Sequence, residues 1–380
     1  MKKKVDRWPV VATLVGVSSL SVLAGTVVTP ALPLLEAHFS SHPSAGHLVR
    51  MVLTIPSLVI ALVSPFAGML TDRVDRRLPL AVGLVLFGLA GGSGYLLSSL
   101  TGILVSRGLV GVGIALIATS VTALIADFYQ GDSRSRFMGL QAALMGIGGV
   151  FFLAGGGLLA ELGWRPPFLL HLIALVFVVP VLFVLWRSER VSEPGAADDA
   201  RMPWGDVAFL TMAVFAGMGG FYILLVQVPF KLDLLSISPT LSGVAIALST
   251  LVGVFTSLAY APLKRRFHYS TILSVTFLCI GIGMAVTGYS SSFAGVQGGL
   301  LIVGLGIGLI MANCTVWLTS KVPAPLRGRA VGIFMTGLFL GQFLMPLASQ
   351  LLVADFGLTR VLTSFGGALA LLGLAVLKRR

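Results

Sequence analysis

Long apolar runs follow one another along almost the whole of this chain, and they leave few folds open to it. A membrane-spanning helix needs about 20 apolar residues, and its backbone groups must bond within the run because lipid offers no partner. Only 11% of the residues are charged, against about 25% in soluble domains, which excludes a soluble core. We predict twelve spans, at residues 10–35, 47–70, 78–98, 102–126, 136–160, 166–187, 205–230, 239–262, 270–289, 293–318, 328–352 and 359–377.

Basic residues mark one side of the membrane. Of the 26 Lys and Arg residues, 21 lie near the two termini or in the loops that share their side. Short cytoplasmic loops collect Lys and Arg, so this bias predicts that both termini are cytoplasmic. It also accounts for the net charge of +12 without a nucleic-acid partner. The remaining five are Arg50, Arg107, Arg165, Lys231 and Arg360.

The middle of the chain predicts two halves. Residues 188–204 are polar, contain Pro and Gly, and separate six spans from six. The stretch is too short for a domain, and we interpret it as a flexible cytoplasmic linker. The expected domains are an N-terminal bundle over residues 1–187 and a C-terminal bundle over residues 205–380.

An internal repeat supports this division. A shift of 193 residues places Gly111 on Gly304 and Gly113 on Gly306 without a gap. The same shift aligns two R-x-R-x-x-G loops, at residues 134–139 and 327–332. Two related halves in one membrane chain indicate a duplicated six-helix unit.

A charged hairpin lies between the second and third spans. The stretch from Gly68 to Leu80 reads GMLTDRVDRRLPL and gathers five charges in six residues. Its spacing, G-x-L-x-D-R-x-x-R-R, resembles the cytoplasmic loop between the second and third helices of major facilitator superfamily transporters. The resemblance implies an all-α membrane protein with twelve transmembrane helices in two pseudo-symmetric six-helix bundles. The alternative is that the charges only fix the orientation of the chain.

The resemblance also assigns roles within this hairpin. It implies that Gly68 lets the second helix pack closely on the eleventh, and that Asp72 caps that contact. It further implies that Arg76 or Arg77 pairs with an acid ending the fourth span, which here is Asp127. Ion pairs of this kind hold by geometry and release at little net cost, which suits a cytoplasmic gate. The expected gating residues are Gly68, Asp72, Arg73, Arg76, Arg77 and Asp127.

One residue departs from the family pattern. Asp75 stands where these transporters usually have Gly. Because Asp tolerates left-handed backbone better than most residues, we expect the turn to form with Asp75 in that conformation.

Arg107 lies inside the fourth span, in RGLVGVGIA. An intramembrane Arg is a functional candidate by default. The pattern R-x-x-x-G-x-G-x-A is similar to a fourth-helix pattern that the family uses near its central cavity, where the Arg influences proton coupling or substrate charge. The alternative is an Arg that snorkels to the outer interface.

The positions of the acidic residues limit the charge that the substrate can carry. All fourteen lie at span ends or in loops. With Arg107 as the expected cavity charge, we infer a substrate that is neutral, zwitterionic or anionic. A proton carrier is then sought in Glu36, at the outer end of the first span, or His171, in the sixth. The alternatives are a plain loop acid and a structural histidine.

The fifth span matches the antiporter pattern of the family only in part. That pattern ends in Gly-Pro followed by a glycine pair. Laying Gly156 and Gly157 on the pair puts Phe152 and Leu153 where Gly-Pro would stand. The glycines still permit close helix packing.

Polar and soft residues on the inner spans are the expected substrate contacts. Buried amides need partners, and Met and aromatic side chains adapt to varied apolar ligands. The alternative is that they join neighbouring helices. The candidates are Ser18, Ser21, Thr26, Thr119, Ser120, Gln141, Met145, Tyr222, Gln227, Asn313, Met335 and Gln342.

Nothing in the sequence indicates an enzyme. There is no G-x-x-x-x-G-K nucleotide motif and no metal-ligand spacing, so we expect no catalytic residue, metal or cofactor. The resemblance is to bacterial drug–proton antiporters. It implies a monomer in the inner membrane that exports a small amphipathic molecule. The alternatives are a dedicated exporter of a metabolite or siderophore, and a non-transporting receptor or an enzyme on the same scaffold.

Overall fold

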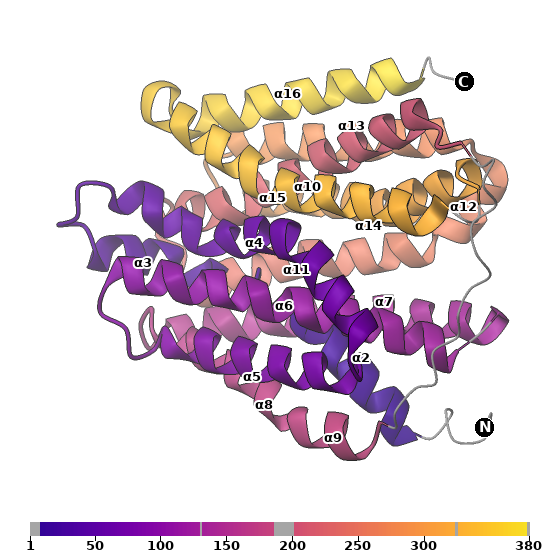
Figure 1. Cartoon of the computed structure of the whole chain (residues 1–380). Coiled ribbons are helices and arrows are strands. Elements are labelled where there is room, and N and C mark those ends of the chain that lie inside the picture. The colour runs from indigo at the N-terminus through magenta and orange to yellow at the C-terminus, as the bar shows by residue number, and fades with distance from the viewer. Residues whose placement is uncertain (1–7, 130, 186–200, 324–325, 378–380) are drawn as a thin grey trace. The chain divides into compact units, whose positions relative to one another are not determined.

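The computed structural model describes residues 8–129, 131–185, 201–323 and 326–377, and no strand occurs among them. Figure 1 shows the helices in chain order. In the described ranges, ten helical segments are long and apolar enough to cross a bilayer, and α2 and α5 are shorter apolar helices. These segments account for the twelve predicted spans, as expected for an all-α membrane protein.

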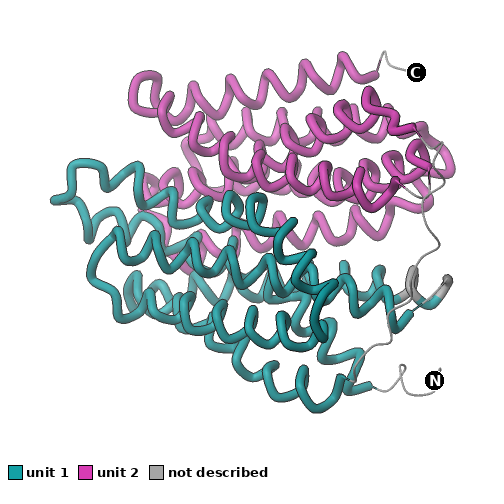
Figure 2. The backbone as a smooth tube through the Cα atoms, in the orientation of Figure 1, with its two compact units in different colours: residues 1–193 teal, residues 194–380 magenta. Residues whose placement is uncertain are grey.

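The chain divides into two compact units, residues 1–193 and 194–380, which are coloured separately in Figure 2. Residues 188–200 of the predicted linker lie outside the described residues. Unit 1 holds α2 (Trp8–Leu23), η1 (Thr29–Ala31), α3 (Leu32–His38), α4 (Ala45–Arg73), α5 (Arg77–Ser93), α6 (Leu100–Phe128), α7 (Gly131–Ala160), η2 (Pro166–Leu172), α8 (Ile173–Val176) and α9 (Val178–Phe183). Unit 2 holds α10 (Trp204–Asp233), α11 (Pro239–Leu258), α12 (Tyr260–Arg266), α13 (Tyr269–Tyr289), α14 (Phe293–Lys321), α15 (Arg327–Phe356) and α16 (Leu358–Leu377).

The first predicted span is broken. Helix α2 ends at Leu23, turns follow over residues 24–28, and η1 and α3 complete the crossing. Pro30 has no N–H to donate to the carbonyl four residues back. Pro33 has none either, so a second bond of the same kind is missing three residues later. Regular α-helical bonding is therefore interrupted in the second half of the span.

The sixth predicted span is also irregular. It starts as the 3₁₀ segment η2, in which Pro166 and Pro167 occupy the first positions, and continues through α8 and α9. Proline fixes φ and suits the first turn of a helix, but it cannot donate to the turn before it. This irregular segment carries His171.

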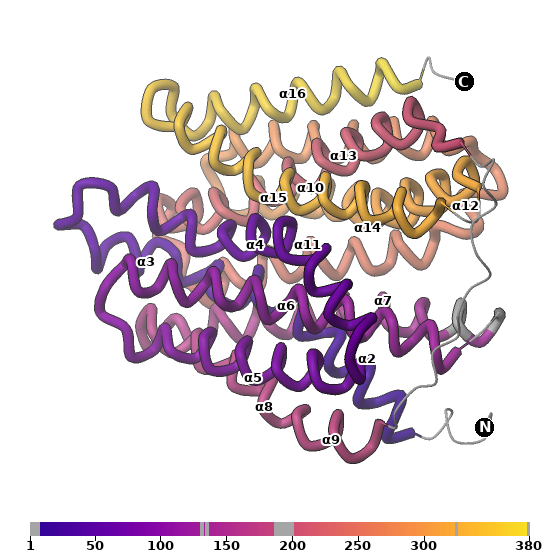
Figure 3. Tube along the Cα trace, in the orientation of Figure 1, coloured from indigo at the N-terminus to yellow at the C-terminus, as the bar shows by residue number. Residues whose placement is uncertain are grey.

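The repeat predicted from sequence has a matching geometry in each unit. A Cβ at Gly111 would lie 2.8 Å from a backbone oxygen of α4, and one at Gly113 would lie 2.9 Å from a backbone oxygen of α5. In unit 2, a Cβ at Gly304 would lie still closer to a backbone oxygen of α11, and one at Gly306 would lie 2.7 Å from a backbone oxygen of α13. The fourth helix of each half thus packs through equivalent glycines on the second and third. Figure 3 shows α6 running between α4 and α5.

Candidate functional site

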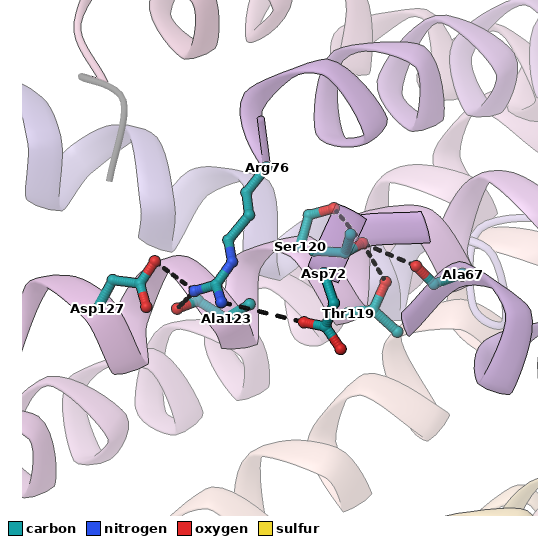
Figure 4. A network of polar contacts seen from close by, with 8 residues as sticks. Ala67, Asp72, Arg76, Thr119, Ser120, Ala123 and Asp127 are labelled. Carbon is teal, nitrogen blue, oxygen red and sulfur yellow. Dashed lines mark hydrogen bonds and ion pairs between the residues drawn. The ribbon is translucent and has the colours of Figure 1, made fainter. Parts of the chain in front are cut away.

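Arg76 is the centre of the charge cluster between α4 and α5. Its guanidinium pairs with the carboxylate of Asp127, near the end of α6, and donates to the Ala123 carbonyl at 2.8 Å. The nearer oxygen of Asp72 is 4.0 Å away. Figure 4 shows Arg76 reaching from the hairpin to α6 between these groups. The cluster therefore connects the hairpin to α6.

The members of this cluster differ in exposure. The side chains of Arg76 and Asp127 keep 15% and 7% of their surface, whereas Asp72 keeps 73%. An exposed pair at the limit of contact contributes little, but breaking a largely buried pair leaves an uncompensated charge. Arg73 is exposed as well. Within unit 1, the Arg76–Asp127 pair is thus the energetically significant part of the expected gating set.

Asp75 has its own arginine. Its carboxylate lies 2.7 Å from Nη2 of Arg77 and also accepts the Arg77 backbone N–H at 3.1 Å. Arg77 donates further to the Leu185 carbonyl at 3.1 Å. The expectation of a left-handed Asp75 is wrong, because Ser236 is the only non-glycine residue with positive φ in the described part of the chain. The turn instead closes through the Asp75 side chain, which bonds the backbone two residues on.

Hydroxyl groups join α4 to α6 beside the cluster. Thr71 donates to the Ala67 carbonyl at 2.8 Å and lies 3.3 Å from Ser120 and 3.5 Å from Thr119. Thr119 and Ser120 were expected in a substrate cavity, and here they contact a neighbouring helix (Figure 4). A Cβ at Gly68 would meet nothing within 4 Å inside unit 1, so packing there does not require glycine. Its expected contact with the eleventh helix stays a prediction.

Arg107 is fully buried within unit 1. Its Nη2 donates to the Ala24 carbonyl at 2.6 Å, and its Nε donates to the Val52 carbonyl at 3.2 Å. Its Nη1 lies 3.0 Å from Nε2 of His171. The snorkelling alternative is wrong, because all three partners lie inside the bundle. Among the described residues, no carboxylate pairs with Arg107.

Two of the three coupling candidates meet here. Arg107 and His171 are 64 residues apart in the sequence, and no local pattern predicts that they touch. Glu36, the third, lies on α3 and pairs with Arg50 at 2.8 Å. Arg50 also donates to the Gly46 carbonyl at 2.7 Å. Glu36 therefore ties the C-terminal end of the first span to α4.

The remaining cavity candidates of unit 1 contact neighbouring turns. Gln141 donates to Ser18 on α2 at 2.9 Å, which joins α7 to α2. Thr26 donates to the Val22 carbonyl at 2.9 Å, in the break of the first span. Met145 and Ser21 are half-buried. Gln141 therefore makes the contact between neighbouring helices that was the alternative to a substrate contact.

Two of the cavity candidates of unit 2, Gln227 and Asn313, have unused acceptors. Gln227 donates to Ser349 at 3.5 Å and Asn313 donates to the Tyr269 carbonyl at 3.0 Å, and both are fully buried. The side-chain carbonyl oxygens of Gln227 and Asn313 have no hydrogen-bond partner. Tyr222 and Met335 are half-buried and Gln342 is buried.

A comparison of sequences settles the family. A profile of the Major Facilitator Superfamily matches residues 14–346. The chain belongs to the Major Facilitator Superfamily. Members of this superfamily to which the chain is similar are transporters, not enzymes.

Curated relatives of this superfamily member are named as efflux proteins. The chain is 26% identical over 365 residues to the multidrug efflux protein YfmO of Bacillus subtilis, covering 94% of this chain and 89% of that protein. It is 21% identical over 328 residues to the quinolone resistance protein NorA of Staphylococcus aureus, covering 83% of each.

Solved structures of the superfamily have the same fold. A bacterial homolog of the human lysosomal transporter Spinster, inward-facing and occupied, matches with a TM-score of 0.81 at 16% identity, covering 97% of this chain and 95% of that one. The D-xylose–proton symporter matches with a TM-score of 0.77 at 16% identity, covering 97% and 96%. At these identities the likeness concerns the fold alone.

Sequence reasoning missed three residues of this transporter's site. Thr71 lies on α4 inside the charged motif, and its only signal in the sequence is its position before Asp72. Ala24 takes part through its backbone carbonyl, which no side-chain pattern reveals. Gly91 is one of many glycines in the third span, and only the structure shows that a Cβ there would strike the His171 ring.

Proposed function

We propose that this transporter exports a small amphipathic compound by alternating access, driven by the proton gradient across a bacterial inner membrane. Its relatives YfmO and NorA, named as efflux proteins, are similar over most of the chain. We further propose that it works as a monomer with both termini in the cytoplasm, and that residues 1–187 and 205–380 move as bundles joined by a linker at 188–204.

The observation that carries the proposal is the Arg76–Asp127 pair. It closes the α4–α5 hairpin on α6 through a largely buried ion pair. Such a pair has a small net free energy when made and a large cost when half of it is removed, so it suits a contact that forms in one state and opens in the other. We assign it the role of a cytoplasmic latch, with Asp72, Arg73 and Arg77 as its polar rim.

The substrate class follows from the charges. Arg107 is a buried cation with no carboxylate paired to it in the described chain. A buried cation disfavours a second cation and favours an anionic or neutral group nearby. We therefore propose neutral, zwitterionic or anionic substrates, with Gln227 and Asn313 offering unused acceptors to donors on the substrate.

The test is flux into proteoliposomes. Purified protein is reconstituted, a pH gradient is imposed, and uptake is measured for a zwitterionic fluoroquinolone and for a permanent dication of similar size. We expect gradient-driven uptake of the zwitterion, abolished by a protonophore and lowered more than about tenfold by Asp127→Ala. Preference for the dication would contradict the substrate class, and gradient-independent equilibration would contradict coupled export.

A dedicated exporter of a metabolite or metal-chelating siderophore is the second candidate. The observation in its favour is that the acidic residues lie at span ends and in loops, away from the place where cationic drugs would need them. Competition of an anionic chelator against the fluoroquinolone in the same vesicles separates the two. A receptor that does not transport would show no flux of either compound.

A further inference from the structure

The contact between Arg107 and His171 fixes the proton on the histidine. Arginine has only donors, so Nε2 of His171, 3.0 Å from Nη1, must be the acceptor. The other ring nitrogen, Nδ1, lies 3.0 Å from the carbonyl oxygen of Phe168 and therefore carries the hydrogen. His171 in this structure is the neutral Nδ1–H tautomer.

The surroundings hold the imidazole in this orientation. His171 is fully buried, its ring lies 5.2 Å from that of Phe87 on α5, and Phe168 lies on its other side, 6.5 Å away. Gly91 on α5 has no side chain, and a Cβ there would overlap the imidazole. The ring therefore has one place to sit, with Nε2 directed at Arg107.

Arg107 in turn reaches the break in the first span. Its Nη2 donates to the Ala24 carbonyl at 2.6 Å, which is the shortest of its contacts. Ala24 is the first residue after α2, where the regular helical bonding stops. A continuous chain of contacts thus runs from the Phe168 carbonyl through His171 and Arg107 to the turn at residues 24–28.

We propose that His171 is a positioning residue that holds Arg107 on the broken first span, and that a proton taken up at its Nε2 releases Arg107 from that position. The proton converts the only acceptor on this side of the guanidinium into an N–H, and it puts two cations 3.0 Å apart in the bundle interior. One of them must then move, and the Ala24 carbonyl loses its partner. This inference rests on the proposed proton-coupled transport and names the residue where the proton acts.

Among the described residues, no carboxylate pairs with His171 or Arg107, so none is placed to neutralise the second cation. Arg77 is the only charge on α5 and lies 14 residues before Gly91, about 21 Å along the helix. Charges on α6 and α7 other than Arg107 lie at the far helix ends, and α8 has none. The charged or titratable groups on the elements around His171 and Arg107 are Arg77, Tyr95, Arg107, Asp127, Asp132, Arg134 and Arg136, with Glu36 and His38 on α3, His47, Arg50, Asp72 and Arg73 on α4, and Glu161 and Arg165 in the loop before η2.

Three variants separate positioning from mere folding. His171→Gln keeps an acceptor for Arg107 but cannot take up a proton. Gly91→Ala keeps the histidine and displaces its ring, because the new methyl group overlaps it. Gly88→Ala is the matched control one turn earlier on α5. A Cβ there would lie 2.9 Å from the flexible end of Leu175 and 3.5 Å, an ordinary contact, from the His171 backbone oxygen, away from the imidazole ring.

The first readout is backbone amide exchange of residues 24–29 and 31 in the intact protein, corrected for intrinsic rates. Between about pH 8 and about pH 4.5, a range carried below the ordinary His titration because the added proton stands beside a buried cation, we expect protection in the wild type to fall about tenfold. His171→Gln should keep the high-pH protection throughout, Gly91→Ala should lack it throughout, and Gly88→Ala should match the wild type. A pH-independent wild type, or a His171→Gln profile that still changes, would overturn the inference.

The second readout is the pH profile of fluoroquinolone flux. We expect His171→Gln to keep flux near the wild-type value at about pH 8 and to lose the rise at acidic pH, since its side chain does not titrate. A variant profile that follows the wild type would contradict the role of His171. Absence of any proton-driven flux in the wild type would instead contradict the proposed function, and the exchange experiment would still decide the positioning role.

Discussion

The two halves of this transporter close the loop after their second helix in different ways. In unit 1, the hairpin between α4 and α5 uses acids and bases, with Arg76 on Asp127 and Arg77 on Asp75. In unit 2, the segment from α12 to α13 carries three consecutive bases, Lys264–Arg266, and no acid. The duplicated scaffold therefore does not dictate the chemistry of the loop.

Aromatic rings occupy the place of the ion pair in unit 2. The 193-residue shift places Arg76 on Tyr269 and Asp127 on Ser320. Tyr269 stacks on Trp317 of α14 with ring centroids 5.5 Å apart and an interplanar angle of 13°. The ammonium of Lys264 lies 3.9 Å from the centre of the Tyr269 ring. The third helix of each half is thus tied to the fourth, by charge in unit 1 and by stacking in unit 2.

This difference bears on mechanism. An ion pair and a stacked pair both hold two helices together, but only the ion pair leaves a costly unpaired charge when one partner is lost. We infer that the state-dependent contact belongs to unit 1, and that the bases of unit 2 act mainly through orientation in the membrane.

Loss of Asp127 should have the largest effect. Asp127→Ala leaves the Arg76 guanidinium largely buried with only the Ala123 carbonyl, and should cost about 3 kcal/mol of stability. We expect gradient-driven flux to fall more than about tenfold, because about 1.4 kcal/mol of free energy already corresponds to a factor of ten. Thermal unfolding and proteoliposome flux measure the two effects. Asp206→Ala, at the start of α10, is the control and should leave both unchanged.

Loss of Asp75 should cost less. Asp75→Ala removes the partner of Arg77 and the bond that closes the turn, at about 1–2 kcal/mol for a partly exposed, charge-assisted contact. Asp75→Asn keeps the turn bond and should recover about half of the loss in thermal unfolding. Equal effects for the two variants would mean that the charge alone matters here.

Disrupting the aromatic stack should be milder still. Tyr269→Leu keeps an apolar side chain but loses the stacking on Trp317, which contributes about 1 kcal/mol. We expect a small drop in the unfolding temperature with flux kept within about twofold. A flux defect as deep as that of Asp127→Ala would remove the distinction between the two loops.

Neutralising Lys264 should have the smallest effect. Lys264 is half-buried over the Tyr269 ring, and its remaining contact to the Phe267 carbonyl is long, at 3.5 Å. Lys264→Met should lower the free energy of unfolding by at most about 1 kcal/mol, the upper end of the range for an exposed cation–π contact. Thermal unfolding of this variant beside Tyr269→Leu tests whether the ring or the charge matters.

The sequence predicts the elements well because membrane helices depend on local runs of apolar residues. A pair between Asp127 and either Arg76 or Arg77 could be predicted because the hairpin motif and the end of the fourth span carry a family resemblance, and the structure selects Arg76. Arg107 and His171 could be singled out, since charged or titratable residues inside apolar runs stand out.

The rest depends on contacts that no local pattern encodes. The Arg107–His171 contact needs a proline-rich sixth span and the space left by Gly91. The break at residues 24–28 supplies an acceptor through the backbone, where residue identity carries no information. At Asp75, a side-chain bond to the next turn replaced the left-handed backbone that the family comparison favours.

The most direct test of the latch is a double-mutant cycle on gradient-driven flux with Arg76→Met, Asp127→Asn and the two combined. Each single change leaves one charge unpaired, whereas the double change leaves none. We predict that both single variants fall about tenfold or more and that the double variant transports faster than either. Losses that simply multiply, or single variants that transport as fast as the wild type, would contradict a functional ion pair.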